Sequence, residues 1–194
     1  MARPKEFDVD KALDAAMETF WEKGYEATSV CDLTERMGVQ KASLYGTFGD
    51  KRQLFLAALT KYARDDHREL KQHFAGALSV KRAFRELFAE IVQHTTSERP
   101  QSGCFCVNAA TELAQHDTEV AELLDQHFRA VERVLKAAIE RGQVAGEIRA
   151  RVDAGLVAKH LTVTLLGMAV ASKLGAGERR ISDSAKVALS LLDA

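Results

Sequence analysis

The chain has 194 residues, of which 46% are apolar and 28% are charged, and only two are prolines. A chain of this length holds one moderate domain or a small domain fused to a larger one, and the composition is typical of a mostly helical protein. The net charge is −1, and the first fifty residues contain ten acidic and six basic side chains. A broad positive field that attracts nucleic acid is therefore excluded, so any DNA contact must depend on a few local cations. The candidates are Arg3, Lys5, Arg36, Lys41, Lys51 and Arg52.

The cysteine count and the apolar runs predict the compartment. There are three cysteines, an odd number, and no signal-peptide pattern opens the chain, which favours a reduced cytoplasm over a disulfide-bonded scaffold. The longest apolar run without an acidic residue, lysine or arginine covers residues 160–172, whereas crossing a bilayer takes about 20 residues. We therefore expect a cytoplasmic protein that does not enter a membrane.

The chain is predicted to begin with a basic segment and one helix. Residues 1–7 are basic, with Arg3 and Lys5, and form either an arm that follows DNA phosphates or a minor groove, or a frayed terminus. Residues 8–23 are predicted to form a helix that Asp8 caps and Gly24 ends. We assign Trp21 and Tyr25 to the core behind the next element.

Residues 28–48 are predicted to form two short helices joined by a tight turn at Gly38. Thr28 or Ser29 can cap the first helix through its hydroxyl, and Asp32 places negative charge near the positive end of that helix. Gly38 supplies the backbone freedom that a helix C-terminus needs. Apolar side chains recur at helical spacing, namely Val30, Leu33 and Met37, followed by Val39, Leu44 and Phe48.

The second of these helices has an exposed side of hydrogen-bonding groups. An amide, an ammonium, two hydroxyls and a phenol lie there, and such groups suit phosphates and base edges. They belong to Gln40, Lys41, Ser43, Thr47 and Tyr45. We interpret residues 28–48 as a helix-turn-helix that reads DNA. The alternative is a helical hairpin that only packs, because a glycine between two short amphipathic segments is common.

Residues 15–55 resemble the N-terminal domain of TetR-family transcriptional repressors. The matching positions are Phe20, Gly24, Tyr25, Thr28, Ser29, Val30, Gly38, Val39, Lys41, Ala42, Ser43, Leu44, Tyr45, Phe48, Lys51, Leu54 and Phe55. The chain departs from the family pattern at Thr34, Met37, Gly46 and Thr47. Gly46 removes a possible phosphate contact and costs about 1 kcal/mol of helix stability. These departures affect the expected operator sequence more than DNA binding itself.

The resemblance implies an all-α fold with two domains. Residues 1–52 would be a three-helix DNA-binding domain, and residues 53–194 a helical domain for effector binding and dimerisation. It also implies a homodimeric repressor that a small-molecule effector releases from double-stranded operator DNA. The implied DNA-contacting residues are Thr28, Ser29, Gln40, Lys41, Ala42, Ser43, Tyr45, Thr47 and Lys51.

The rest of the chain is predicted to be helical. The expected helices cover residues 50–74, 79–95, 103–115, 117–141, 152–174 and 182–192, with a loop at 97–102. The first of them is apolar in its first half and charged in its second. In the family, this helix couples the two domains.

The helix at 152–174 is predicted to contribute to a dimer interface. It contains only three charged residues, so it must be covered on nearly all sides. Gly167 and Ala171 would let two helix backbones approach closely. The helix at 182–192 would complete a four-helix interface through Ile181, Ala185, Ala188, Leu189 and Leu192. A buried core helix within one chain is the alternative. A two-fold dimer would read two half-sites about 34–36 Å apart, or a multiple of that, in a near-palindrome.

An effector pocket is expected among the middle helices. Seven apolar and two polar side chains would line it, a typical proportion for a ligand site. The nine are Phe84, Phe88, Ile91, Phe105, Phe128, Leu165 and Met168, with Asn108 and Glu112. Each of the apolar residues is equally suited to plain core.

Cys104 and Cys106 are a second candidate functional site. On a helix their side chains would point about 200° apart, so they would not pair easily. Cys104 would lie in a first helical turn, where the helix dipole favours the thiolate. One hypothesis is that Cys104 senses oxidants or electrophiles. The other is that both cysteines only pack.

No enzyme, cofactor or metal site is expected. The six histidines, at positions 67, 73, 94, 116, 127 and 160, are scattered without metal-ligand spacing. Two other function classes are rivals. One is a thiol sensor or small-molecule binder without DNA function. The other is a helical enzyme, which would need a cluster of titratable side chains that the sequence does not indicate.

Overall fold

The computed structural model describes residues 7–94, 103–175 and 177–193, and within these ranges the chain forms helices and no strand. The predicted all-α fold is confirmed. The helices are α1 (Val9–Lys23), α2 (Val30–Met37), α3 (Lys41–Phe48), α4 (Lys51–Ala75), α5 (Val80–His94), α6 (Phe105–Leu113), α7 (Thr118–Val144), α8 (Ala154–Lys173) and α9 (Glu178–Ser190).

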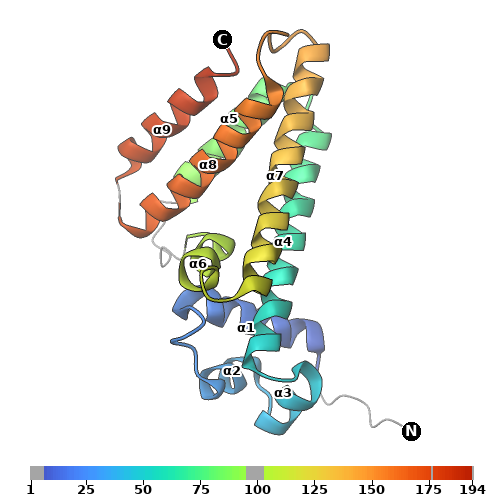
Figure 1. The fold of residues 1–194 in the computed structure, drawn as a ribbon, viewed down its shortest axis with the longest axis vertical. Helices are drawn as coiled ribbons and strands as arrows, with labels where there is room; N and C mark the ends of the chain where they lie inside the picture. Colours follow the sequence, from blue (N-terminus) through green and yellow to red (C-terminus); the bar gives the residue numbers. More distant parts are fainter. Residues whose placement is uncertain (1–6, 95–102, 176, 194) are drawn as a thin grey trace, which may run out of the picture.

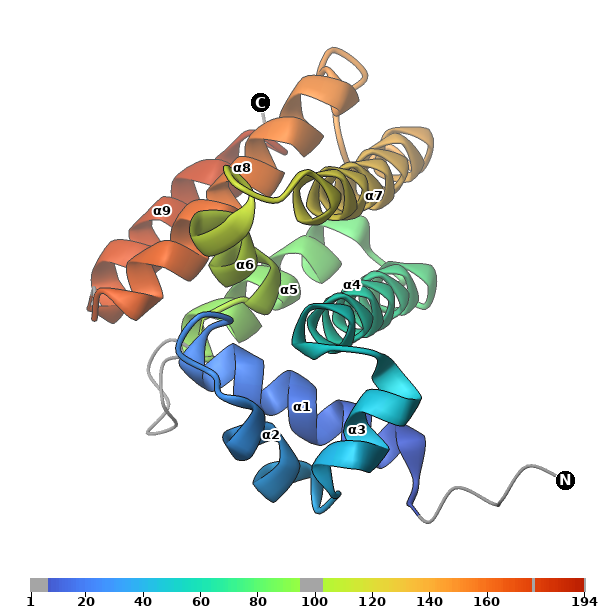
Figure 2. The same ribbon diagram turned by 60° about the horizontal axis from the view of Figure 1, so that its bottom comes forward.

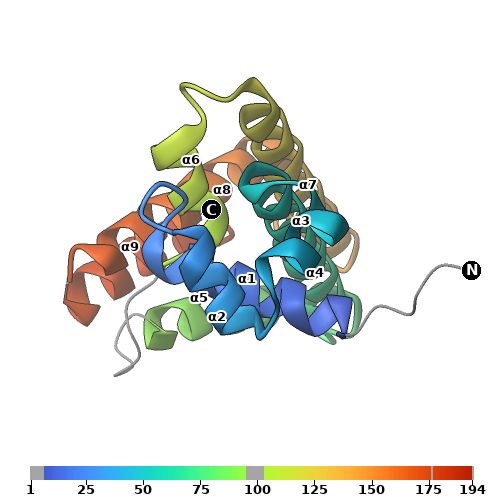
Figure 3. The same ribbon diagram turned by 90° about the horizontal axis from the view of Figure 1, so that it is seen from below.

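The molecule is elongated, with α1, α2 and α3 gathered at one end (Figure 1). Helices α4 and α7 run side by side along the long axis, away from this end (Figures 1 and 2). Helices α5, α8 and α9 pack at the other end, where the C-terminus lies. Seen from below, α1–α3 lie in front of the remaining helices, and α6 lies close to the loop between α1 and α2 (Figure 3). We call α1–α3 the head.

The helix starts follow from capping side chains. Asp8 accepts hydrogen bonds from the amides of Asp10 and Lys11 at the start of α1. Asp50 caps α4 and Asp117 caps α7 in the same way. Each carboxylate satisfies amides that have no partner within the helix and faces the positive end of the helix dipole. The predicted starts at these three aspartates are therefore confirmed.

Some boundaries differ from the prediction. Helix α9 begins at Glu178, four residues before the expected start at 182. Helix α7 continues past Arg141 to Val144. The predicted basic arm at Arg3 and Lys5 and the predicted loop at 97–102 lie outside the described residues.

Two apolar cores hold the chain together. The core at the head end contains the apolar faces of α1–α3 and also reaches the first half of α4, α6 and the start of α7. The core at the far end joins the second half of α4 to α5, α7, α8 and α9. Leu54, Phe55, Phe105 and Leu124 therefore share one core with Phe20 of the head. A division of the chain at residues 52 and 53 would cut through this core.

Helix α8 leaves apolar side chains on the surface. Leu156, Val163, Val170 and Leu174 are 65%, 64%, 41% and 79% exposed, and their spacing of seven, seven and four places them on one stripe. Among the described residues, α8 also passes a length-and-composition test for a membrane span, with 20 residues and a mean hydropathy of 1.5. The uncharged run at residues 160–172 is shorter than this helix, because Lys159 and Lys173 bound it, and the core helix of a soluble protein can have the same length and composition.

Candidate DNA-binding interface

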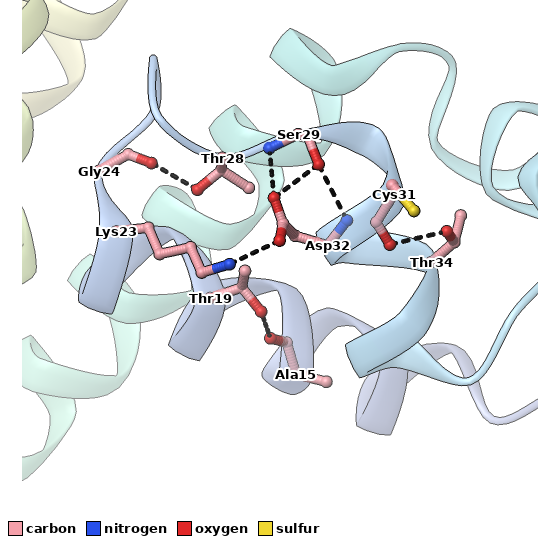
Figure 4. Close-up of polar contacts among 9 residues, drawn as sticks. All are labelled: Ala15, Thr19, Lys23, Gly24, Thr28, Ser29, Cys31, Asp32 and Thr34. Atoms are coloured by element: carbon pink, nitrogen blue, oxygen red, sulfur yellow. Dashed lines mark hydrogen bonds and ion pairs between the residues drawn. The ribbon is translucent and has the colours of Figure 1, made fainter.

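The first helix of the predicted hairpin begins with a complete capping box. The Ser29 hydroxyl accepts from the Asp32 amide at 3.1 Å, and the Asp32 carboxylate accepts from the Ser29 amide at 2.8 Å (Figure 4). Lys23 from α1 also contacts Asp32, at 2.5 Å. Hydrogen bonds from Lys23 and Ser29 hold the pKa of Asp32 well below its usual range. These contacts fix α2 against the end of α1.

The turn after α2 depends on Gly38. Its φ of 65° and ψ of 32° lie in the left-handed region, which glycine adopts without a Cβ clash. The Val39 amide then donates to the Thr34 carbonyl at 3.1 Å and closes the end of α2. Leu33 and Leu44 are fully buried on either side of the turn. The predicted helix-turn-helix geometry is present, with α3 held against the head core through Leu44.

The outward side of α3 carries most of the predicted DNA-contacting residues. Gln40, Lys41, Ala42 and Tyr45 are exposed, while Ser43 and Thr47 are half-buried. The Lys41 ammonium lies 5.7 Å from the centre of the Tyr45 ring, close enough for a cation–π contact. This surface offers an amide, a cation and a phenol on one helix.

The prediction that Thr28 contacts DNA needs correction. It is 1% exposed, and its hydroxyl donates to the Gly24 carbonyl at 2.5 Å (Figure 4). Its side chain therefore stabilises the α1–α2 loop and is not available to a phosphate. The predicted choice between Thr28 and Ser29 as the cap is settled in favour of Ser29. The Ser29 hydroxyl remains on the surface but already takes part in the capping box.

The candidate cations divide into two groups. Arg36 contacts Glu18 at 3.2 Å and Glu22 at 3.6 Å. Arg52 is held by Asp117 and Glu119, each at 2.8 Å. Within the described part of the chain, Lys41 and Lys51 enter no ion pair, and the Lys51 ammonium lies 4.4 Å from the centre of the Tyr25 ring. Lys41 and Lys51 are thus the described candidates whose charge is not neutralised by a neighbouring carboxylate.

The apolar residues predicted to line an effector pocket belong to two different cores. Phe84, Phe88 and Met168 are buried in the far-end core, with Ile91 and Leu165 packed against it. Phe105 is buried in the head-end core, and Phe128 packs against that core. The predicted single apolar lining is therefore divided between two cores.

The two predicted polar lining residues have other partners. Asn108 on α6 accepts from the Lys173 ammonium at 3.0 Å. The Glu112 carboxylate accepts from the backbone amides of Tyr25 and Glu26, at 3.0 and 2.8 Å. Glu112 therefore faces the head and not a pocket among the middle helices. The prediction was wrong here because a polar side chain on a helix stripe does not show which neighbour it meets.

The cysteine geometry also differs from the prediction. Cys104 is the N-cap of α6, with φ −97° and ψ 129°, and so lies before the first helical turn. This extended backbone differs from the helical conformation that the prediction assumed for Cys104. The Tyr62 hydroxyl lies 3.7 Å from the Cys104 sulfur. The hydrogen bond from Cys106, with help from the Val107 amide and Tyr62, lowers the pKa of Cys104 to about 7.

Sequence reasoning missed the contacts between the head and α6. Besides Glu112, the Trp21 indole donates to the Gly103 carbonyl at 3.0 Å. These partners are more than eighty residues apart along the chain. The residue types do not predict these contacts, because every residue has a backbone carbonyl and nearly every residue a backbone amide, and the sequence does not show which of them a side chain will meet.

Comparison with protein-family models gives two matches. The model described as bacterial regulatory proteins, tetR family, matches residues 12–58. The model described as tetracyclin repressor-like, C-terminal domain, matches residues 80–187. The first match contains the capping box, the Gly38 turn and α3, and the second contains most of α5–α9.

Individual relatives cover nearly the whole chain. The HTH-type transcriptional repressor ComR of Escherichia coli is 36% identical, over 97% of this chain and 90% of its own. An uncharacterized HTH-type transcriptional regulator of Bacillus subtilis, YezE, is 33% identical over the full length of both. A cysteine mutant of the TetR-family regulator CifR, solved with a 26-bp double-strand operator, is 32% identical. It covers 97% of this chain and 98% of its own, with a TM-score of 0.84.

Proposed function

Because the chain belongs to the tetR family of bacterial regulatory proteins, we propose that it represses transcription as a homodimer on a near-palindromic operator. A small-molecule effector releases it from that DNA. The protein acts in the cytoplasm and uses no cofactor. The observation that carries the proposal is the exposed side of α3, where Lys41 lies beside Tyr45 on a helix anchored by Leu44, with the exposed Gln40 as its N-cap.

Each of these side chains has a role that its chemistry supports. The Gln40 amide and the Tyr45 phenol can meet base edges in a major groove, where donor and acceptor patterns distinguish the base pairs. Lys41 contacts bases or phosphates, together with its neighbours Ala42, Ser43 and Thr47. Lys51, at the start of α4, contacts the DNA backbone. Support for a duplex partner comes from the similar chain of CifR, which was solved with operator DNA.

The dimer proposal depends on the exposed stripe of α8. Leu156, Val163, Val170 and Leu174 are joined by Val187 of α9, which is 69% exposed. An open groove of about 750 Å³ lies between α8 and α9, lined by residues that include His160, Gly167 and Arg180. A second copy of the chain, packed about a two-fold axis, would fill this groove and cover the stripe. The same two helices were predicted to form the interface, and the predicted Gly167 and Ala171 line this groove.

The predicted contributions of α9 need correction. Ile181, Ala185, Ala188 and Leu192 are 1–5% exposed and pack in the far-end core of their own chain. Leu189 is half-buried against the same core. They cover α5 and α8 within one chain, so only the opposite side of α9 remains for a partner.

The effector proposal is an equilibrium between two states. An effector that binds the conformation with low DNA affinity more tightly must lower DNA affinity, and DNA must weaken effector binding by the same factor. The match of residues 80–187 to a tetracyclin repressor-like C-terminal domain supports the assignment of this role to α5–α9. Since the predicted lining residues divide between two cores, the proposal names no lining set.

Selection of bound sequences from a random pool of double-stranded DNA, in reducing buffer, tests this function. We expect a near-palindrome with half-sites about 34–36 Å apart or a multiple of that distance. The recovered duplex can then be used to screen small molecules for release. Recovery of sequences that resemble the unselected pool would contradict operator binding.

The thiol pair favours a second candidate function, in which oxidation of Cys104 lowers DNA affinity. The neighbours of Cys104 lower its pKa to about 7, which favours the thiolate, the reactive form. Hydrogen peroxide would give a sulfenic acid and water, and the Cys106 thiol could then displace a second water to form a disulfide. Such a change would remove the hydrogen bonds that Tyr62 and Cys106 make with the Cys104 sulfur.

Cysteine variants separate this function from plain packing. DNA affinity is measured before and after peroxide for the wild type, Cys104→Ser and Cys31→Ser. Cys31 is the matched control, because it is exposed near the start of α2 and away from the thiol pair. Loss of the peroxide effect in Cys104→Ser alone is expected. An equal effect in all three proteins, or no effect in the wild type, would leave the cysteines as packing residues.

A further inference from the structure

We propose that Glu112 on α6 is a positioning residue that sets the orientation of the head relative to the C-terminal helices. The proposal depends on the function proposed above, in which α3 in the head reads DNA. Glu112 uses both carboxylate oxygens: Oε2 accepts from the Tyr25 amide at 3.0 Å, and Oε1 accepts from the Glu26 amide at 2.8 Å. A planar group held at two points fixes direction as well as distance.

The α1–α2 loop is shaped to receive this carboxylate. Gly24 has a φ of +84°, which side-chain-bearing residues rarely adopt, and a Cβ there would lie 3.0 Å from the Glu112 Oε2 atom. Two successive loop amides thereby point at one anionic group, as in backbone nests that bind anions. Glycine at position 24 thus both permits the turn and leaves room for the carboxylate.

The loop transmits this position to the reading helix. The Tyr25 ring packs against Phe20 and Phe55, with centroid distances of 6.2 and 5.0 Å. The Lys51 ammonium lies over the same ring, and Lys51 begins α4 three residues after the end of α3. A shift of the loop therefore moves a ring that contacts both α1 and the start of α4.

Two further contacts tie the segments on either side of α6 to α1 and α4. Before α6, the Gly103 carbonyl accepts from the Trp21 indole at 3.0 Å. After α6, Asp117 holds Arg52 of α4 through two hydrogen bonds of 2.8 and 2.9 Å. Glu112 lies between them, and it is the contact made by α6 itself. A rotation or translation of α6 that keeps these two bonds carries the α1–α2 loop with it, so α6 would transmit changes in the C-terminal helices to the head.

The test compares Glu112→Gln with Glu122→Gln. Glutamine keeps the size of the side chain but replaces one acceptor oxygen with a donor, which cannot receive a hydrogen bond from a loop amide. Glu122 is the matched control, because it is exposed on the neighbouring α7. Thermal unfolding establishes that both variants are folded before they are compared.

Head orientation is measured directly by a spin-label distance within one chain, between position 35 on α2 and position 137 on α7. Glu35 and Ala137 are exposed, and labels introduced as unnatural amino acids leave the native cysteines unchanged. Excess unlabelled protein suppresses distances between copies. We expect one narrow distance for the wild type and for Glu122→Gln, and a shifted or broadened distribution for Glu112→Gln.

Operator affinity gives the second readout. We expect Glu112→Gln to bind the selected operator at least fivefold more weakly than the wild type, and Glu122→Gln to bind within twofold of it. A wild-type distance distribution in Glu112→Gln, or a changed distribution with unchanged operator affinity, would overturn the proposal. If the wild type selected no operator, the function proposed above would fail, while the distance measurement would still decide whether Glu112 orients the head.

Discussion

Replacing Val163 with glutamate should separate the proposed homodimer into single chains. Val163 lies in the middle of the exposed α8 stripe and is 64% exposed. Burying a valine side chain is worth about 1.5 kcal/mol, so covering the exposed part contributes about 1 kcal/mol per copy and about 2 kcal/mol per two-fold pair. An unpaired carboxylate in each copy adds a desolvation cost of about 1–3 kcal/mol. The total is at least about 4 kcal/mol, which raises the dimer Kd roughly a thousandfold.

Sedimentation velocity over a range of concentrations measures this change, with Val144→Glu as the control. Val144 is 91% exposed at the end of α7 and is not one of the α8 stripe residues, so the same substitution there should leave the dimer intact. Operator affinity should fall for Val163→Glu, because one head then has to hold a half-site alone. A Val163→Glu protein that remains dimeric at the wild-type concentration would refute the assignment of the α8 stripe as the interface.

Three further predictions concern single side chains. Lys41→Ala should weaken DNA binding and reduce the slope of log K against log salt by about 1, because one phosphate contact is lost; a salt titration with an unchanged slope would remove Lys41 from the phosphate contacts. Ser29→Ala should destabilise the protein by about 1 kcal/mol through loss of the α2 cap, seen as a Tm lowered by about 2–4 °C, whereas Ser190→Ala should have no such effect. Asp66→Asn should stabilise the protein above pH 6 and not near pH 4. Burial raises the pKa of Asp66 to about 6, so ionisation opposes folding and stability is lost as the pH rises through that value. Because 44% of its side chain is exposed, screening limits the gain to about 1 kcal/mol or less. Thermal unfolding at both pH values measures this gain. An equal gain in stability at pH 4 would show that ionisation of Asp66 is not its cause.

The local features of the fold could be predicted from the sequence. Asp8, Ser29 and Asp117 begin helices because a side-chain oxygen reaches amides within three residues, and Gly38 ends α2 through its own backbone conformation. The start of α9 was missed because Glu178 and the two arginines after it show no apolar pattern. The core contact through Ile181 extends the helix to include them.

The exposed side of α3 was predictable in part, because Lys41 and Tyr45 are four residues apart and share a face beside the buried Leu44. Thr28 was misplaced, since its hydroxyl could serve as a cap, a loop contact or a phosphate contact, and only the fold selects the bond to Gly24. Glu112 was misplaced for a related reason, because its partners are backbone amides 86 and 87 residues away.

The thiol pair and the dimer surface show how backbone detail changes a prediction. A helical geometry would separate Cys104 from Cys106, but Cys104 is the extended N-cap of α6, and Cys106 lowers its pKa. The apolar residues of α9 suggested an interface, yet they cover their own chain. The apolar stripe that remains exposed, through Val163 and Val170 on α8, could be identified only after the intramolecular core was known.

The central claim is that α3 reads the operator bases. The most direct test is selection from random double-stranded DNA with the wild type and, in parallel, with Gln40→Ala/Tyr45→Ala. These two side chains are exposed on α3, so the double variant should fold as the wild type does. We predict a near-palindrome for the wild type and, for the variant, relaxed preference at the same positions in both half-sites. Enrichment of the same sequence to the same degree by both proteins would contradict the assignment of α3 as the reading helix.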